Sequence, residues 1–295
     1  MDACGLIIPV ELWALVLRHV PWPQRVRLRG LSKAWRGSLN SPALWRNKPF
    51  RECIVGQFHD VDRRFAERFA ECCGRGELAT AQWLAGAGRL GAAGVRAAGN
   101  TALYRACAGG HFELAQWLVD DFGLGPDDAR DHDNLALRWA CSRGRLAVAQ
   151  WLAATFGLGP ADARCSNNGA LCDACEGGHL ELVQWLVDRF GLGPADARTT
   201  NNLALRSACR EGRLAVAQWL VARFGLGPAD ARSDDNYALR WACREGRLET
   251  AQWLVAAFGL GPADARSRDN WALCAARRNS HADVVQWLGA RFGLV

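Results

Sequence analysis

Cysteines are the side chains of this sequence whose spacing could support metal or redox chemistry. Cys172 and Cys175 form a C-x-x-C pair, but no second pair follows at the distance that a zinc site needs. Six of the twelve cysteines instead recur in one column with a constant step of 34 residues. These are Cys73, Cys107, Cys141, Cys175, Cys209 and Cys243. Such regularity is typical of a small apolar core residue, so we predict buried, reduced thiols.

Motifs of catalysis are missing from the sequence. It contains no G-x-x-x-x-G-K-[ST] phosphate loop, no H-E-x-x-H and no G-x-S-x-G, the patterns typical of phosphate-binding proteins, metalloproteases and α/β-hydrolases. Three histidines alternate with arginines in one repeat column, which runs through His111, Arg145, His179, Arg213, Arg247 and His281. A column that accepts either residue indicates surface positions, so we predict no enzyme, no metal and no cofactor.

Arginine and tryptophan side chains suggest a different chemistry, because both residue types are frequent hot spots of protein interfaces. They gather in a few columns of the repeat. The candidates for binding a target protein are Arg138, Trp139, Arg206, Arg210, Arg240, Trp241 and Arg244. An arginine-rich groove would suit an acidic target segment. The alternative is a solvated helix face without a partner, and the residues alone do not separate the two.

The charge of the chain is concentrated at its start. The formal net charge is +6, and residues 1–50 alone hold eight Lys or Arg against two acids. The other residues hold 28 basic and 28 acidic side chains, so we predict no binding of nucleic acid. No stretch approaches the roughly 18 apolar residues needed to span a bilayer. We therefore expect no membrane segment and a cytoplasmic or nuclear protein.

A 34-residue repeat determines the predicted architecture. The tripeptide Gln-Trp-Leu occurs seven times at this step, around Trp83, Trp117, Trp151, Trp185, Trp219, Trp253 and Trp287. Within residues 202–235, Leu205, Ala208 and Cys209 form the stripe of a short helix that Gly212 ends. Residues 214–221 form a second helical stripe, and 225–235 are predicted as a loop with Pro228. We expect the Trp column to lie in the core between stacked units.

The repeat pattern N-x-A-L-x-x-A-C-x-x-G-[HR]-L-x-x-A-Q-W-L resembles the ankyrin repeat over residues 66–295. The Ala-Leu pair matches its T-P-L element, and Trp-Leu matches its Leu-Leu. The sequence departs from the family in its longer period and in the His that follows T-P-L. That column holds Tyr104, Arg138, Cys172, Arg206, Arg240 and Cys274 instead. The hydrogen-bond network that the family His supports is therefore in doubt here.

Residues 8–46 lie outside the repeat and resemble an F-box. The resemblance rests on four motifs in order: I-P-V-E-L at 8–12, V-P at 20–21, L-S-K-A-W at 31–35 and S-P-A-L-W at 41–45. An F-box docks on a Skp-family adaptor of a cullin-RING ubiquitin ligase. The matching apolar residues are Pro9, Leu12, Leu17, Val20, Pro21, Leu28, Leu31, Trp35, Leu44 and Trp45. Several of these can instead hold a small helical bundle together.

The two resemblances imply an all-α protein with a short helical F-box head, a linker and an ankyrin-like helix-turn-helix solenoid. We expect the head at 1–50, the linker at 51–65 and seven repeats starting near 66, 100, 134, 168, 202, 236 and 270. The layout is similar to families of giant DNA viruses. It implies a ubiquitin-ligase substrate receptor, a monomer outside its complex, with an adaptor and cullin at the head and a target protein on the array. The alternative is a scaffold or decoy that sequesters a protein without degrading it.

Overall fold

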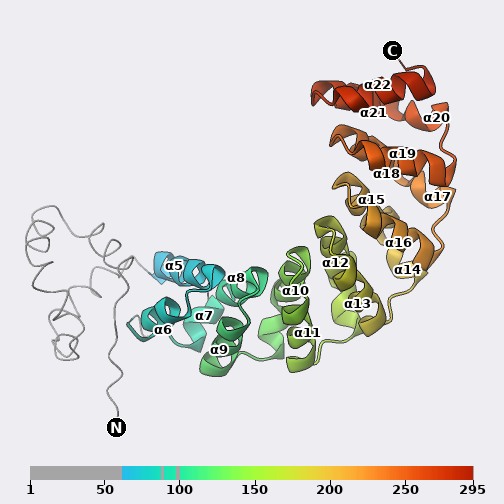
Figure 1. Ribbon diagram of the computed structural model, residues 1–295. Coiled ribbons are helices and arrows are strands. Elements are labelled where there is room, and N and C mark those ends of the chain that lie inside the picture. Colours follow the sequence, from blue (N-terminus) through green and yellow to red (C-terminus); the bar gives the residue numbers. More distant parts are fainter. Residues whose placement is uncertain (1–61, 88–89, 98–99, 295) are drawn as a thin grey trace, which may run out of the picture. The chain divides into compact units, whose positions relative to one another are not determined.

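The computed structural model describes residues 62–87, 90–97 and 100–294 (Figure 1). Among these residues the secondary structure is helical, and no strand occurs. This confirms the all-α class and the repeated helix-turn-helix arrangement for the described part of the chain. The ten predicted head residues, from Pro9 to Trp45, lie outside the described residues, so the head stays a prediction. The chain divides into one compact unit that ends at Ala102 and another that begins at Leu103.

The described part of the first unit consists of three helices and the start of a fourth. These are α5 (Asp62–Arg75), α6 (Leu78–Ala87) and α7 (Ala92–Ala97), followed by the first residues of α8 (Thr101–Gly109). Phe69 and Cys73 of α5 are buried, and so are Ala81 and Leu84 of α6. These buried residues pack α5 and α6 together as the first helix pair.

The second unit is a series of helix pairs that follow one another in chain order (Figure 1). We call the first member of each pair the inner helix and the second the outer helix. After α8, the inner helices lie in α10 (Pro126–Ser142), α12 (Pro160–Gly177), α15 (Thr199–Arg210), α18 (Ser233–Arg244) and α21 (Ser267–Arg278). The outer helices are α9 (Phe112–Phe122), α11 (Leu146–Thr155), α13 (Leu180–Phe190), α16 (Leu214–Phe224), α19 (Leu248–Phe258) and α22 (Ala282–Phe292). Each inner helix packs on the next, from α10 through α21.

Glycines end the helices where the sequence predicts. Gly212 follows the inner helix α15 with φ 71°, and a Cβ there would lie 2.7 Å from Cδ of Arg247. The left-handed backbone therefore favours glycine, and a Cβ there would also require the Arg247 side chain to shift. Gly225 caps the outer helix α16 with φ 60°, and its N–H donates to the carbonyl of Val221. Leu205 and Leu220 are fully buried at the centre of the two apolar stripes, and Leu214 and Val221 are partly exposed at the edge of the second.

The loop between repeats contains a helical turn that the sequence did not predict. One-turn helices α14 (Pro194–Ala197), α17 (Pro228–Ala231) and α20 (Pro262–Ala265) begin at the loop proline. In α10 and α12 the same turn joins the inner helix across a kink of non-helical residues, at 131–134 and 165–168. Proline suits the first helical position because it has no N–H to leave unpaired. The prediction of an irregular loop over 225–235 is wrong for Pro228–Ala231.

The tryptophan column lies at the edge of the core, not in its centre. Trp185 is partly exposed on α13, and its ring meets Phe190 edge-on with 5.7 Å between centroids. The same Trp–Phe pair, five residues apart, recurs on α9, α11, α16, α19 and α22. Leu186, the next residue, is fully buried. The prediction of a buried Trp column is therefore wrong in part, because the following Leu takes the central position.

The cysteine column is confirmed as core. Cys107, Cys141, Cys175, Cys209 and Cys243 are each fully buried. Burial raises the pKa of Cys243 to about 12, so its thiol stays protonated. All the cysteines of the described residues are free thiols, and the same residues hold no cluster of metal-binding side chains. The repeated thiol therefore acts as a small apolar residue between neighbouring helices.

Candidate protein-binding surface

Each loop of the second unit enters its inner helix through three consecutive left-handed residues. In the first turn of α18, where the chain is kinked, Asp234, Asp235 and Asn236 have φ of 53°, 55° and 59°. The same conformation recurs at 132–134, 166–168, 200–202 and 268–270. Non-glycine residues in this region cost about 1 kcal/mol or more each, so the surroundings must hold the turn in place. The short polar side chains of Asn and Asp tolerate the conformation best.

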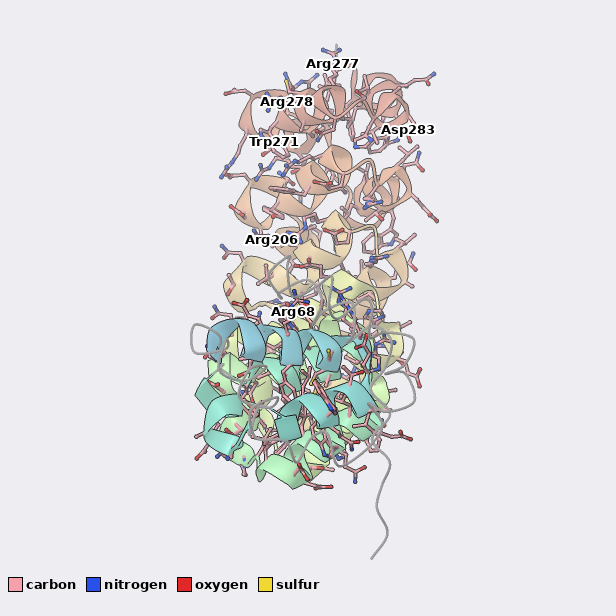
Figure 2. The ribbon with its side chains drawn as sticks, turned by 90° about the vertical axis from the view of Figure 1, so that its left-hand side faces the viewer. Arg68, Arg206, Trp271, Arg277, Arg278 and Asp283 are labelled. Atoms are coloured by element: carbon pink, nitrogen blue, oxygen red, sulfur yellow. The ribbon has the colours of Figure 1, made fainter. Side chains whose placement is uncertain are left out.

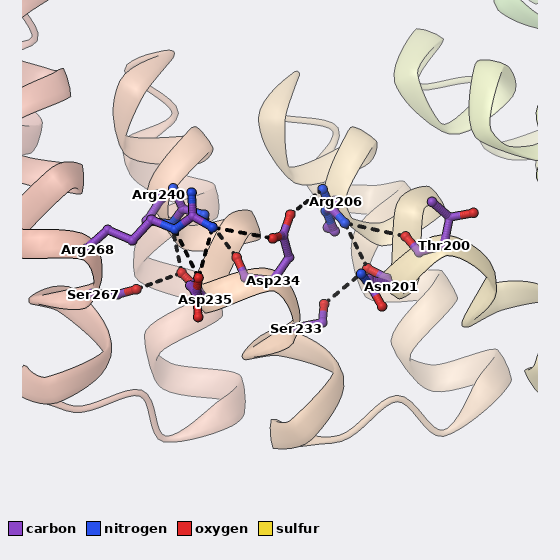
Figure 3. A network of polar contacts seen from close by, with 9 residues as sticks. All are labelled: Thr200, Asn201, Arg206, Ser233, Asp234, Asp235, Arg240, Ser267 and Arg268. Atoms are coloured by element: carbon purple, nitrogen blue, oxygen red, sulfur yellow. Dashed lines mark hydrogen bonds and ion pairs between the residues drawn. The ribbon is translucent and has the colours of Figure 1, made fainter.

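Two arginines of the predicted target surface hold these turns (Figure 3). Arg240 donates from Nε to the carbonyl of Asp235 at 2.7 Å and from Nη2 to that of Asp234 at 2.9 Å. Only 3% of Arg240 is exposed. Burial, and then the charge of Arg268, lowers the pKa of Arg240, although a guanidinium stays charged in proteins. Its donors are directed at the backbone and not at solvent.

Arg206 has the same role one repeat earlier (Figure 3). It donates to the carbonyls of Thr200 and Asn201 at 3.4 and 3.3 Å, and it pairs with Asp234 of the next loop at 2.8 Å. Only 9% of Arg206 is exposed. Arg206 and Arg240 thus occupy the column of the missing family His and supply donors to the loop backbone. The structure gives both a loop-holding role, so neither presents its guanidinium to a partner.

Polar side chains also tie each left-handed turn to the next (Figure 3). Ser233 donates to the carbonyl of Asn201 at 3.1 Å, and Ser267 donates to that of Asp235 at 2.7 Å. Arg268 adds an ion pair with the Asp235 carboxylate at 2.9 Å. The left-handed turns at the starts of α15, α18 and α21 therefore form one connected edge, which fixes the neighbouring inner helices in register.

Four of the other predicted target-binding residues lie at least partly exposed on inner helices. Trp139 of α10 is 38% exposed. Arg244 and Trp241 of α18 lie together, with the guanidinium carbon 4.1 Å from the ring centroid. Arg210 of α15 pairs with Glu176 at 3.0 Å and with Glu211 at 2.8 Å. These side chains are accessible to a partner, although Arg210 is held by two carboxylates and Arg244 lies 3.5 Å from that of Glu245.

Arg138 occupies a mixed position. It pairs with Asp173 of the next inner helix at 2.9 Å and lies over Gly169, where a Cβ would come within 2.6 Å of its Nε. Burial raises the pKa of Asp173, and the Arg138 guanidinium opposes that shift. The side chain of Arg138 is 26% exposed. The main role of Arg138 is to join α10 to α12, and a protein partner could contact only the exposed part of its side chain.

The column of histidines and arginines is a set of inter-repeat bridges, which corrects the prediction of plain surface residues. His179 Nε2 lies 3.1 Å from the carbonyl of Ser142, at the end of the preceding inner helix. Arg145 donates to the carbonyl of Ala108 at 3.2 Å, and Arg213 donates to that of Glu176 at 3.1 Å. Both His and Arg side chains are long enough to donate an N–H to a carbonyl at the end of the preceding inner helix. This explains why the column accepts either one.

An arginine–aspartate ladder along the loops was missed by the sequence reasoning. Arg164 donates to both carboxylate oxygens of Asp196, at 2.8 and 3.1 Å, and to the carbonyl of Gly191 at 3.2 Å. The Gly193 N–H donates to Asp196 at 2.8 Å. The Arg164 guanidinium, together with that N–H, lowers the pKa of Asp196 despite partial burial. The pattern recurs at Arg130–Asp162, Arg198–Asp230 and Arg232–Asp264. The recurring P-A-D-A-R motif could have revealed it.

Comparison with known families agrees with this geometry. A model of ankyrin repeats in three copies matches residues 69–160, and a model of many copies matches 171–221 and 205–255. The chain is an ankyrin repeat protein. Ankyrin repeats are modules of protein–protein interaction, so the partly exposed side chains of the inner helices are candidate contacts for a protein partner. No curated protein matches the chain. Among the described residues, no helix is long and apolar enough to cross a membrane.

Proposed function

We propose that this ankyrin repeat protein is a substrate receptor of a Skp-cullin-F-box type ubiquitin ligase. Residues 1–50 would bind a Skp-family adaptor, and the repeats over 66–295 would bind the protein to be modified. The observation that carries the proposal is the order of four F-box-like motifs within residues 8–45, directly before an ankyrin array. Chemistry would come from other subunits of the ligase, so the chain needs no catalytic residue of its own.

The array supports the proposal because it can present a partner in a fixed position. Charged contacts join each repeat to the next, as in the Arg164–Asp196 pair at 2.8 Å and the Arg206–Asp234 pair at 2.8 Å. A receptor gains from such rigidity, because an ordered surface loses less conformational entropy when it binds. Trp139 and Trp241 are partly exposed on that surface, and tryptophan is enriched among binding hot spots.

Affinity purification of the intact chain beside a head variant tests the ligase part of the proposal. The variant carries Leu12→Ala, Pro21→Ala and Trp35→Ala, which remove three residues of the F-box-like motifs. Recovery of a Skp-family adaptor and a cullin with the intact chain alone is the expected result. Circular dichroism of both proteins shows whether the repeats remain folded. Recovery of neither subunit with a folded intact chain would overturn the proposal.

The second candidate is a scaffold or decoy that sequesters a protein without marking it for degradation. One observation favours it: the matches to ankyrin families begin at residue 69, so the head rests on its motifs alone. In that case the array would hold its target as described, and the target would keep its normal lifetime. The lifetime of a bound target therefore distinguishes the two candidates.

A further inference from the structure

An aromatic ladder crosses the inner helices of the last two repeats. Tyr237 and Trp241 of α18 are stacked, with 5.2 Å between ring centroids and 22° between ring planes. Trp271 of α21 continues the ladder at 5.7 Å from Trp241. All three rings are partly exposed. No other inner helix among the described residues carries such a group, since the equivalent positions of α15 hold Leu203 and Ser207.

Guanidinium groups of the chain already lie on these rings. Arg206 lies 3.8 Å from the centroid of Tyr237, Arg244 lies 4.1 Å from that of Trp241, and Arg240 lies 5.1 Å from that of Trp271. Because these cations occupy the electron-rich ring faces, a cationic ligand would have to compete with them. The surface is therefore unsuited to a lysine or methyl-lysine segment and is open to an anion.

A guanidinium over a ring face can still donate N–H groups to an anion. Among the described residues Arg244 has one acidic contact, from Nε to Glu245 at 3.5 Å, so its other donors are available. The contact with Trp241 restrains this guanidinium before a ligand arrives, which lowers the entropy cost of binding a carboxylate. Buried Arg206 and Arg240 differ, because their donors already bind the loop carbonyls.

Two further arginines extend the positive charge to the last inner helix. Arg277 and Arg278 end α21, are exposed, and have no ion pair with any residue that the structure describes. Arg278 occupies the same repeat column as Arg244, whereas Arg277 occupies the column of the buried Cys243. Figure 2 shows Trp271, Arg277 and Arg278 close to one end of the array, with Arg278 and Trp271 toward the edge where Arg206 lies. Residues 237–245 and 271–279 together hold four arginines and one glutamate.

We propose that this surface binds an acidic segment of the target protein. The Arg–Trp surface is defined by Tyr237, Trp241, Arg244, Trp271 and Arg278. Carboxylates of the segment would pair with the two arginines, and an apolar side chain between them would pack on the two tryptophans. Packed helices lie about 8–10 Å apart, so Arg244 and Arg278 suit acids two or three residues apart in an extended chain. The inference rests on the target-binding part of the proposed function and not on the head.

Selection from a library of random twelve-residue peptides tests this inference without requiring the target protein itself. The purified full-length chain serves as bait, beside a variant with Arg244→Gln and Arg278→Gln. The matched control carries Arg189→Gln and Arg223→Gln, which removes the same charge from outer helices. Those control arginines also lie near rings, at 5.4 and 5.8 Å from the centroids of the adjacent phenylalanines.

The intact chain and the control should select peptides enriched in Asp and Glu next to apolar residues, and the Arg–Trp surface variant should not. Fluorescence anisotropy of one selected, labelled peptide should show affinity reduced about tenfold or more in that variant, with the control within about twofold. Replacing the acids of the peptide by amides should have a similar effect. A selection without acidic enrichment, no selected peptide at all, or equal affinity in the variant and the control would overturn the inference. Each outcome is independent of adaptor recovery, so the ligase proposal can stand or fall separately.

Discussion

Arg240→Ala separates a loop-holding residue from a binding residue. The substitution removes two short hydrogen bonds to the carbonyls of Asp234 and Asp235, at 2.9 and 2.7 Å, and the contact with Trp271 at 5.1 Å. Hydrogen bonds to a charged group contribute about 1.5 kcal/mol or more each, and a cation–π contact adds about 0.5 kcal/mol. Because Arg240 is 3% exposed, water cannot replace the donors without a shift of the loop. We expect a loss of about 3 kcal/mol in the free energy of local unfolding.

Native-state hydrogen exchange is the suitable assay, because repeat arrays open locally and one global unfolding energy does not describe them. Amide exchange over residues 233–245 should accelerate in Arg240→Ala and change far less in the outer helix α13, which belongs to an earlier repeat. The matched control is Arg244→Ala, whose side chain is 39% exposed and whose loss should cost less than about 1 kcal/mol. Equal protection in the two variants, or a loss below about 1 kcal/mol for Arg240→Ala, would refute the loop-holding role.

Three further predictions concern the packing and charge of the array. Asp196→Asn should lower the stability of the array at neutral pH and should make that stability depend less on pH in the acid range. The pKa of Asp196 is lowered in the fold. Its contribution to stability is therefore complete above the usual pKa of about 3.9 and is lost as the pH falls through the lowered pKa. If urea titrations gave the intact chain and the variant the same dependence of stability on pH, this prediction would be wrong. Trp185→Ala should lower the stability of its repeat by about 2 kcal/mol, less than the 3–5 kcal/mol expected for a fully buried ring. Leu186→Ala should lower it by at least as much as Trp185→Ala. If Trp185 were the central core residue, hydrogen exchange over α13 would show the larger loss for Trp185→Ala. Iodoacetamide should modify exposed Cys274 and leave buried Cys243 unmodified until the chain is denatured, and mass spectrometry of the native protein that found Cys243 alkylated would contradict its burial.

The repeat period made most of the described fold predictable. Stripes such as Leu205, Ala208 and Cys209, with Gly212 after them, determine where a short helix packs and ends. Periodicity identifies the face that is buried, but it does not show how deeply a side chain reaches. Trp185 belongs to the predicted face and still lies at its edge, since the neighbouring Leu186 fills the centre. The short helix Pro228–Ala231 was missed because one turn is too brief to display a period.

The sequence predicted which residue types form the candidate site, but it predicted the role of each residue only in part. Arg240 and Arg244 lie four residues apart and were predicted alike, yet one is buried against the loop and the other lies open on Trp241. Their roles depend on the left-handed path of residues 234–236, which brings backbone carbonyls to Arg240. A backbone conformation of that kind is not encoded in a hydrophobic pattern. The ladder of Arg164 and Asp196 was hidden for a similar reason, because its partners are 32 residues apart.

The lifetime of a bound target tests the central claim most directly. A protein recovered with the intact chain would be followed after translation is stopped, in cells that express either the intact chain or the variant with Leu12→Ala, Pro21→Ala and Trp35→Ala. The account predicts a shorter half-life with the intact chain, restored by a proteasome inhibitor and by the head variant, while binding to the array persists. An equal half-life with both forms, at equal binding, would contradict a substrate receptor and would leave an ankyrin scaffold.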